Sequence, residues 1–216
     1  MISMYIFIIV ILIILIPFVN FMIKNKDNRV KKIWTYLDKD KNPCMESWKK
    51  HYPDYEITVL NKKNFFKYIN IPIEISHPNL KLTDLVRLFA LDEFGGIWID
   101  HSIVLKAPAN SRKEFAGITK NGIIDKSFIV CNKNSPFIKK WKEEYLKLAN
   151  YGTIEAYMDS CKINNTMKIL INNAKNNPID NAIIVAGQKV LETYPKSELS
   201  LFSPFFIEVC PLDKIG

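Results

Sequence analysis

The chain has 216 residues and a formal net charge of +8, with 48% hydrophobic residues and only 7 glycines. This composition excludes a disordered chain and leaves enough length for one domain with a sizeable core. Nucleic acid is disfavoured as a partner, because the lysines are spread along the chain and no stacked basic–aromatic module occurs. A membrane surface and an anionic ligand fit the positive charge better.

An almost unbroken apolar run covers residues 5–23. As a helix it would extend about 28 Å, close to the hydrocarbon thickness of a bilayer. A secretory signal peptide is the alternative, but no small-residue cleavage site follows and the run is long for such a signal. We therefore predict one N-terminal transmembrane helix in a single-pass membrane protein, with residues 1–28 as anchor and basic flank and residues 29–216 as one domain.

Five basic residues follow the apolar run: Lys24, Lys26, Arg29, Lys31 and Lys32. By the positive-inside rule they place the domain on the cytoplasmic side, and they are also suited to binding anionic lipid headgroups. The opposite orientation is typical of Golgi-type enzymes, so the side of the membrane stays open.

The first part of the domain alternates strands and helices. Residues 33–36 and 56–60 read as strands, and an amphipathic helix is predicted between them at residues 43–51. Residues 61–68 are predicted to form a further helix. This alternation favours an α/β fold.

The central stretch, residues 80–108, begins with a helical pattern. Thr83 is a candidate N-cap, and the leucines that follow recur at helical spacing. Asp84 and Arg87 lie three residues apart, so both side chains can project from one face of the helix. An intrahelical ion pair on a solvated face is the alternative interpretation.

Two glycines, Gly95 and Gly96, are predicted to end this helix, because glycine adopts left-handed C-cap conformations at little cost. A short apolar strand follows at residues 97–99, with Asp100 at its carboxyl end. Ligands of open α/β sheets bind outside the carboxyl ends of the strands. An acidic residue at that position, with an arginine nearby, predicts a site for a metal and a diphosphate.

The second half of the chain continues the α/β pattern. Strands are predicted at residues 115–118 and 127–131, an amphipathic helix at 135–150 and helical structure at 154–176. A strand at residues 183–185 with a short helix after it, and a last strand at 202–209, complete the prediction. The four cysteines contain neither a CxxC pair nor zinc-ligand spacing, so they are interpreted as buried apolar side chains.

Two segments carry a resemblance to a known family. They are IWTYLDKDKNPCMESWKKHYPDYEITVLNKKN at residues 33–64 and TDLVRLFALDEFGGIWID at residues 83–100. Both are similar to capsular polysaccharide synthesis proteins and to the related sugar-binding-region glycosyltransferases. The resemblance implies a single GT-A domain, a Rossmann-like fold with a mixed sheet. It also implies transfer of a hexose from a nucleotide-sugar, such as a UDP-sugar, to a saccharide acceptor, with retention of configuration.

The resemblance also implies a set of donor-binding residues. Asp84 would hydrogen-bond the ribose or the sugar of the donor, and Arg87 would neutralise phosphate. Trp34 is the candidate for stacking on the base, with Tyr36 as the second choice, and a core tryptophan is the equal alternative for Trp34. Trp98 completes the donor-binding set.

Catalytic and metal roles are implied for the residues around the strand end. The resemblance implies that Asp100 and Ser102 hold Mn²⁺ or Mg²⁺, since hard cations prefer oxygen ligands. Many relatives have Asp-X-Asp here, whereas this chain has Asp100-His101-Ser102. We expect His101 to point away from Asp100, because neighbouring residues of a strand face opposite sides. Asp125 is the nearest match to an acidic residue beside the acceptor.

Two further function classes remain open. A degenerate, membrane-anchored sugar-nucleotide or glycan-binding protein is supported by the missing second aspartate. A membrane-anchored interaction protein with a basic surface is the other class, and the central motif speaks against it. Measuring UDP binding with and without Mn²⁺ distinguishes the interaction protein from a transferase. Only a turnover assay distinguishes the degenerate binding protein from an active transferase.

Overall fold

A six-stranded mixed sheet runs through the part of the chain that the computed structural model describes, residues 30–38, 42–72, 75, 77–109, 113–161, 165–174, 176–203, 205 and 207–209. The strand order is β2-β1-β3-β6-β5-β7. The strands are β1 Lys32–Tyr36, β2 Glu56–Leu60, β3 Gly96–Ile99, β5 Phe115–Lys120, β6 Ile123–Cys131 and β7 Leu199–Phe202. Strand β1 is parallel to β2 and β3, and β6 is antiparallel to β3 and β5.

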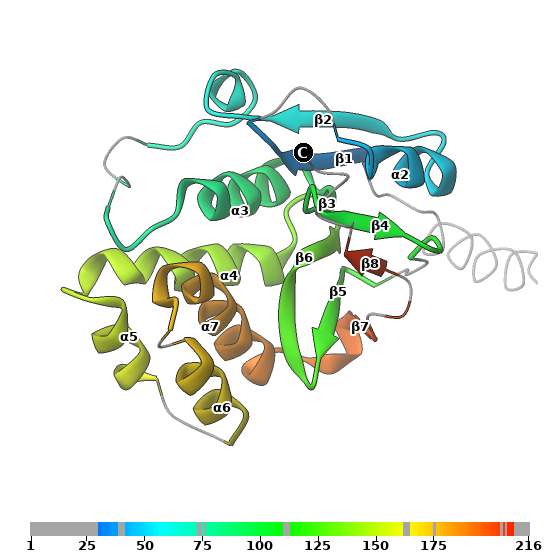
Figure 1. Ribbon diagram of the computed structural model, residues 1–216. Coiled ribbons are helices and arrows are strands. Elements are labelled where there is room, and N and C mark those ends of the chain that lie inside the picture. Colours follow the sequence, from blue (N-terminus) through cyan, green and yellow to red (C-terminus); the bar gives the residue numbers. More distant parts are fainter. Residues whose placement is uncertain are drawn as a thin grey trace, which may run out of the picture.

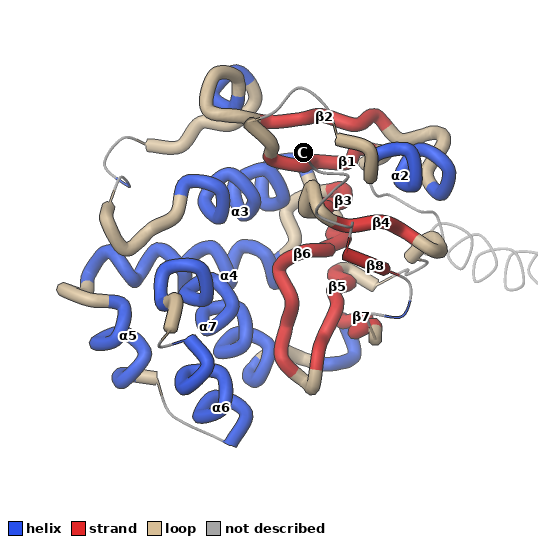
Figure 2. The backbone as a smooth tube through the Cα atoms, viewed as in Figure 1, coloured by secondary structure: helices blue, strands red, loops and turns tan. Residues whose placement is uncertain are grey.

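Helices cover the sheet on both faces, with most of them on one side (Figures 1 and 2). The helices are α2 Met45–His51, α3 Leu82–Phe94, α4 Pro136–Leu146, α5 Ile154–Ser160, α6 Asn165–Ala174 and α7 Pro178–Thr193. Short 3₁₀ helices lie at Phe65–Lys67, Lys147–Asn150 and Lys196–Glu198. A two-stranded ribbon pairs β4 Ile103–Leu105 with β8 Ile207–Val209. The predicted α/β architecture with a mixed sheet is confirmed.

The alternation of side chains along the strands creates two cores. In β1, Trp34 belongs to the larger core, which also contains buried side chains of α3, α4 and α7. Its neighbour Ile33 belongs to the smaller core, together with Trp48 of α2 and Ile103 of β4. The sheet therefore packs against α3, α4 and α7 on one face and has the smaller core, with α2 and β4, on the other.

The turn from α3 into β3 depends on two glycines, as predicted. Gly95 and Gly96 have φ angles of 69° and 99°, a region that L-residues with side chains rarely adopt. A Cβ on Gly95 would lie 2.4 Å from the backbone nitrogen of Lys133, and one on Gly96 would lie 2.5 Å from the carbonyl oxygen of Lys32. This turn brings the end of β3 back beside the helix that carries Arg87.

Some predicted elements differ from those observed. Thr83 is not the N-cap of α3: the cap position is Lys81, and Thr83 lies in the first turn. The helix predicted at residues 61–68 is a single 3₁₀ turn, and the strand predicted at 202–209 is divided between β7 and β8.

The strand predicted at residues 183–185 is wrong, because these residues lie inside the 16-residue helix α7. Pro178 occupies its first turn, where proline is well tolerated. The indole nitrogen of Trp141 donates a hydrogen bond to the carbonyl oxygen of Ile183 at 2.8 Å. A Cβ on Gly187 would lie 2.4 Å from the Trp141 ring. The glycine therefore serves the close packing of α7 on α4 and does not end a strand.

Replacing Gly187 by alanine is expected to destabilise the protein by about 1–3 kcal/mol, because the new methyl group overlaps the buried Trp141 ring. Gly152→Ala is the matched control, since nothing lies within 4 Å of a Cβ at that position. Urea unfolding of both variants measures the difference. Equal stability of the two variants would contradict this account of the α4–α7 contact.

The predicted single-pass membrane localisation is corrected. In the described part of the chain, no helix combines the length and the apolar character that crossing a membrane requires. The apolar run at residues 5–23, and with it the predicted anchor at 1–28, lies outside the described residues.

Candidate active site

A cavity of about 320 Å³ lies at the carboxyl ends of β1 and β3. Because these two strands are parallel neighbours, their carboxyl ends meet at one edge of the sheet, where ligands of α/β proteins gather. The cavity is lined by Tyr36, Leu37, Asp38, Lys81, Thr83, Asp84, Arg87, Trp98, Asp100, His101 and Lys126.

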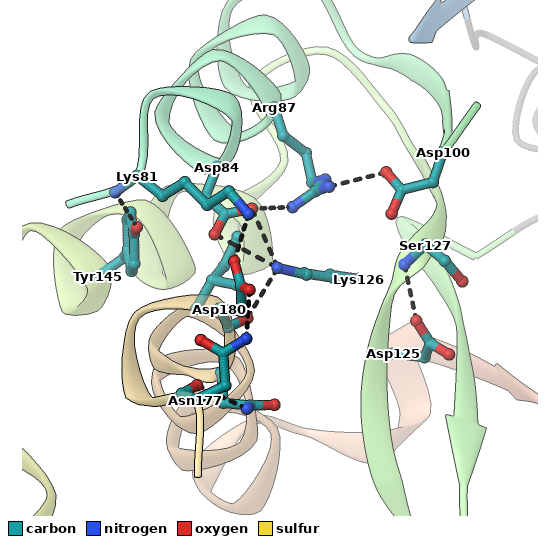
Figure 3. Close-up of polar contacts among 12 residues, drawn as sticks. Lys81, Asp84, Arg87, Asp100, Asp125, Lys126, Ser127, Tyr145, Asn177 and Asp180 are labelled. Carbon is teal, nitrogen blue, oxygen red and sulfur yellow. Dashed lines mark hydrogen bonds and ion pairs between the residues drawn. The ribbon is translucent and has the colours of Figure 1, made fainter. Parts of the chain in front are cut away.

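Arg87 holds two carboxylates together in this cavity (Figure 3). Its Nη1 donates a hydrogen bond to Oδ1 of Asp84, and its Nη2 donates one to Oδ1 of Asp100 at 2.7 Å. The indole nitrogen of Trp98 donates to the same Asp100 oxygen at 2.7 Å, and the guanidinium carbon of Arg87 lies 4.9 Å from the centre of the Trp98 ring. Four of the predicted site residues are therefore in direct contact.

Burial differs strongly within this group. The Asp84 side chain is fully buried and that of Arg87 is 4% exposed, whereas Asp100 is 25% exposed. Burial opposes the charged form of Arg87, but the Asp100 and Asp84 carboxylates raise its pKa above the usual value. Arg87 is therefore a permanent cation between two anions, and Asp100 is the carboxylate that a ligand can reach.

Lys126 also lines this cavity, although the sequence did not suggest it as a site residue. Its ammonium group lies 3.4 and 3.5 Å from the two carboxylate oxygens of Asp84 and donates a hydrogen bond to the carbonyl oxygen of Asp180 in α7 at 2.8 Å. Burial lowers its pKa, and the nearby Asp84 carboxylate opposes that change. Lys126 therefore links β6 to both α3 and α7 at the cavity.

Asp125, the predicted catalytic residue of this strand, points away from the group around Arg87 (Figure 3). Its Oδ1 accepts a hydrogen bond from the backbone nitrogen of Ser127 at 2.8 Å. Neighbouring residues of a strand face opposite sides. If the cavity-facing side of β6 had been known, this alternation would have identified Lys126 and not Asp125 as the residue facing Arg87. An irregularity in the β5–β6 pairing after Gly117 complicates that assignment from the sequence.

The two aromatic candidates of β1 lie in different surroundings. Trp34 is 1% exposed, donates a hydrogen bond to the carbonyl oxygen of Gly95 at 3.0 Å, packs against Phe94 and is not among the cavity-lining residues. Tyr36 does line the cavity. Burial, and next the Asp38 carboxylate, raise the Tyr36 pKa to about 12. Of the two rings, only Tyr36 is placed to contact a ligand there.

Two buried polar atoms of cavity-lining residues have no hydrogen-bond partner among the described residues. They are Nε of Arg87 and the hydroxyl oxygen of Tyr36. A buried polar group without a partner costs about 1–3 kcal/mol. Oxygen atoms of a polar ligand would remove that cost, so the cavity is suited to such a ligand.

The side chains do not form a complete divalent-cation site. Within the described ranges, no three His, Cys, Asp or Glu side chains gather closely enough to hold a metal. Asp100 is already bound by Arg87 and Trp98, and Ser102 is not among the residues lining the cavity. His101 lines the same cavity as Asp100, contrary to expectation, because β3 ends at Ile99 and strand alternation ends with it. Bound Mn²⁺ or Mg²⁺ stays a prediction.

Comparisons with known proteins identify the family. "PaToxG Glycosyltransferase" has 16% identity and a TM-score of 0.44, over 78% of this chain and 81% of that one. The glycosyltransferase GlyE of Streptococcus pneumoniae TIGR4 has 12% identity and a TM-score of 0.38, over 81% of this chain and 45% of that one. Neither similarity is high enough to carry an argument about the site, and no curated protein matches. The family model of capsular polysaccharide synthesis proteins matches residues 16–208. The chain therefore belongs to the capsular polysaccharide synthesis protein family.

Proposed function

We propose that the protein is a glycosyltransferase that moves a hexose from a nucleotide-sugar, preferably UDP-linked, to a saccharide acceptor in polysaccharide synthesis. Membership of the capsular polysaccharide synthesis family supports a transferase. The observation that carries the proposal is the cavity at the carboxyl ends of β1 and β3, where buried polar atoms of Arg87 and Tyr36 lack partners beside the paired Asp84 and Asp100.

The cavity-lining side chains suggest a division of roles. Tyr36 would contact the base or the ribose of the donor. Asp100 would accept hydrogen bonds from the donor's hydroxyl groups, because Arg87 and Trp98 both bind its Oδ1 and leave Oδ2 for a ligand. Both terminal nitrogens of Arg87 are engaged by carboxylates, so Arg87 mainly fixes the positions of Asp84 and Asp100. Positioning of this kind contributes strongly to catalysis, because reacting groups must be held in a narrow range of geometry.

The leaving diphosphate gains negative charge as the bond from the sugar carbon to the phosphate oxygen breaks. Lys126 and Lys81 both line the cavity, and their ammonium groups are suited to stabilising that charge. The Lys81 ammonium group is paired with the Asp180 carboxylate, so it would contact the diphosphate while keeping that ion pair. In a retaining reaction, the acceptor oxygen bonds to the sugar carbon on the face from which the phosphate leaves. The phosphate oxygen takes the acceptor proton, so no separate base is required.

A binding protein without turnover is the second candidate. This candidate is favoured because the Asp84 and Asp100 carboxylates are both already paired with Arg87. In addition, no group of three metal-binding side chains occurs among the described residues. Such a protein would bind the nucleotide-sugar without cleaving the bond between the sugar and the nucleotide.

Calorimetric titration of the full-length chain with UDP and with UDP-hexoses tests the binding step. We expect a dissociation constant between about 1 μM and 1 mM, the range typical of enzyme substrates. Parallel titrations with Mn²⁺ and with EDTA measure any dependence on a cation. No detectable binding of any of these nucleotides in either condition would contradict the assignment of the cavity.

Lys126 is expected to make donor binding depend on pH. Its charged form is the one that attracts phosphate, and burial lowers its pKa below the usual 10.5. Donor affinity should therefore fall as the pH rises through this lowered pKa. Tyr36, with a pKa of about 12, does not ionise in the same range.

The Lys126→Arg variant provides the control, because arginine stays protonated at all these pH values. Measured over the same alkaline range, its affinity for UDP should fall less than that of the wild type. An identical alkaline loss in both proteins would show that another group is responsible.

A further inference from the structure

A second cavity adjoins the first and carries no role so far. It has a volume of about 390 Å³, within the range of small-molecule sites, and it shares Asp100 and Lys126 with the first cavity. Its walls come from the β5–β6 hairpin and from α6 and α7. The lining residues are Asp100, Lys120, Asn121, Ile123, Ile124, Asp125, Lys126, Leu170, Asn181 and Ile184.

The hairpin wall of this cavity is held firmly in place. Asn121 and Gly122 connect paired residues of β5 and β6 with φ angles of 55° and 77°, as expected for a tight two-residue hairpin turn. Gln188 of α7, which is 3% exposed, binds the hairpin at two points. Its side-chain oxygen accepts from the backbone nitrogen of Ile124 at 3.0 Å, and its amide nitrogen donates to the carbonyl oxygen of Gly122 at 3.3 Å. The cavity is therefore preformed between β6 and α7.

The chemistry of the lining combines two kinds of side chain. Ile123, Ile124, Leu170 and Ile184 provide aliphatic surface, while two amides and charged groups provide hydrogen-bonding partners. A sugar ring presents the same combination, with apolar C–H groups on its faces and hydroxyl groups at its rim. The side-chain nitrogen of Asn181 donates a hydrogen bond to the carbonyl oxygen of Asn177 at 2.8 Å, and its side-chain oxygen is left for a hydroxyl group.

We propose that this second cavity is the binding site for the saccharide acceptor, an inference that rests on the proposed transferase function. The residues shared by the two cavities mark the place where the two substrates would meet. A donor in the first cavity and a sugar in the second would meet at Asp100 and Lys126, where the acceptor hydroxyl reaches the sugar carbon of the donor. Asn181 orients the acceptor, and Ile184 packs against its ring.

Two variants of the full-length chain test this site. Asn181→Ala removes an amide from the rim, and Ile184→Trp fills part of the cavity. We measure UDP release from a UDP-hexose without acceptor, transfer to a panel of p-nitrophenyl hexosides, and binding of the same hexosides by saturation-transfer NMR in the presence of UDP. Both variants should raise KM for the hexoside by about tenfold, the effect of one lost hydrogen bond or of steric exclusion. UDP release without acceptor should change by less than about threefold.

Ile169→Ala is the control, because this exposed residue of α6 is not among the lining residues. Unchanged KM values in both cavity variants would overturn the acceptor site while leaving the transferase function standing. The same holds if the wild type hydrolyses the donor but neither binds nor glycosylates any hexoside. No UDP release by the wild type from any UDP-hexose would instead refute the proposed function, and the acceptor site with it.

Discussion

Replacing Asp100 by asparagine is expected to lower kcat/KM for UDP release from the donor by about 10²–10³-fold, the effect typical of removing one preorganised electrostatic contact from an active site. Asparagine has nearly the same shape and can still accept the hydrogen bonds from Arg87 and Trp98, so the fold is preserved. The variant loses the negative charge, and with it the carboxylate oxygen that the donor or an accompanying cation would use.

Steady-state UDP release, measured for the wild type and for Asp100→Asn at equal fractions of folded protein, provides the comparison. Glu93→Gln is the matched control, because Glu93 is an exposed acidic residue of the same helix–turn–strand segment outside the cavity. If Asp100→Asn and Glu93→Gln retained the same activity, Asp100 would have no part in the reaction.

Replacing Arg87 by methionine is expected to reduce the free energy of unfolding by about 3–5 kcal/mol, as is typical when one partner of a buried charge pair is removed. Methionine preserves most of the packing volume, but Asp84, fully buried, and Asp100 lose the cation between them. For a chain of this length the melting temperature should fall by about 10 °C. Thermal unfolding of the two proteins measures this effect.

A second substitution separates charge from packing in this prediction. Adding Asp84→Asn to Arg87→Met removes the unpaired buried charge, so the double variant should be more stable than Arg87→Met alone. The recovered stability measures the coupling between the two residues. If Arg87→Met unfolds at the wild-type temperature, Arg87 does not hold the two carboxylates in the folded protein.

The central stretch was predictable because its signals are local. Helix periodicity, the two glycines and the apolar strand before Asp100 together fix a helix–turn–strand unit, and the turn brings Asp100 within hydrogen-bonding distance of Arg87. Hydrogen bonds across only 13 positions of the chain can be anticipated from such a unit. This is why Asp84, Arg87, Trp98 and Asp100 appear together both in the sequence analysis and in the cavity.

Other parts of the site depend on packing between distant segments. Trp34 and Tyr36 share one face of β1, so strand alternation cannot tell which of them lines the cavity. Their positions along the strand decide this, because Tyr36 lies at the carboxyl end, where the cavity is. The run of β-branched residues at 183–185 resembles a strand, but Pro178 at the start and Trp141 of α4 hold it in α7. The second cavity needs α7 placed against β6, which no local pattern reveals.

The most direct test of the transferase proposal is UDP release by the full-length chain from a panel of UDP-hexoses, measured with Mn²⁺ and with EDTA. The account predicts release from at least one donor, at a rate that Asp100→Asn strongly reduces. Binding of UDP without release from any donor in either condition would contradict a transferase and identify the protein as one that binds nucleotide-sugars without turning them over.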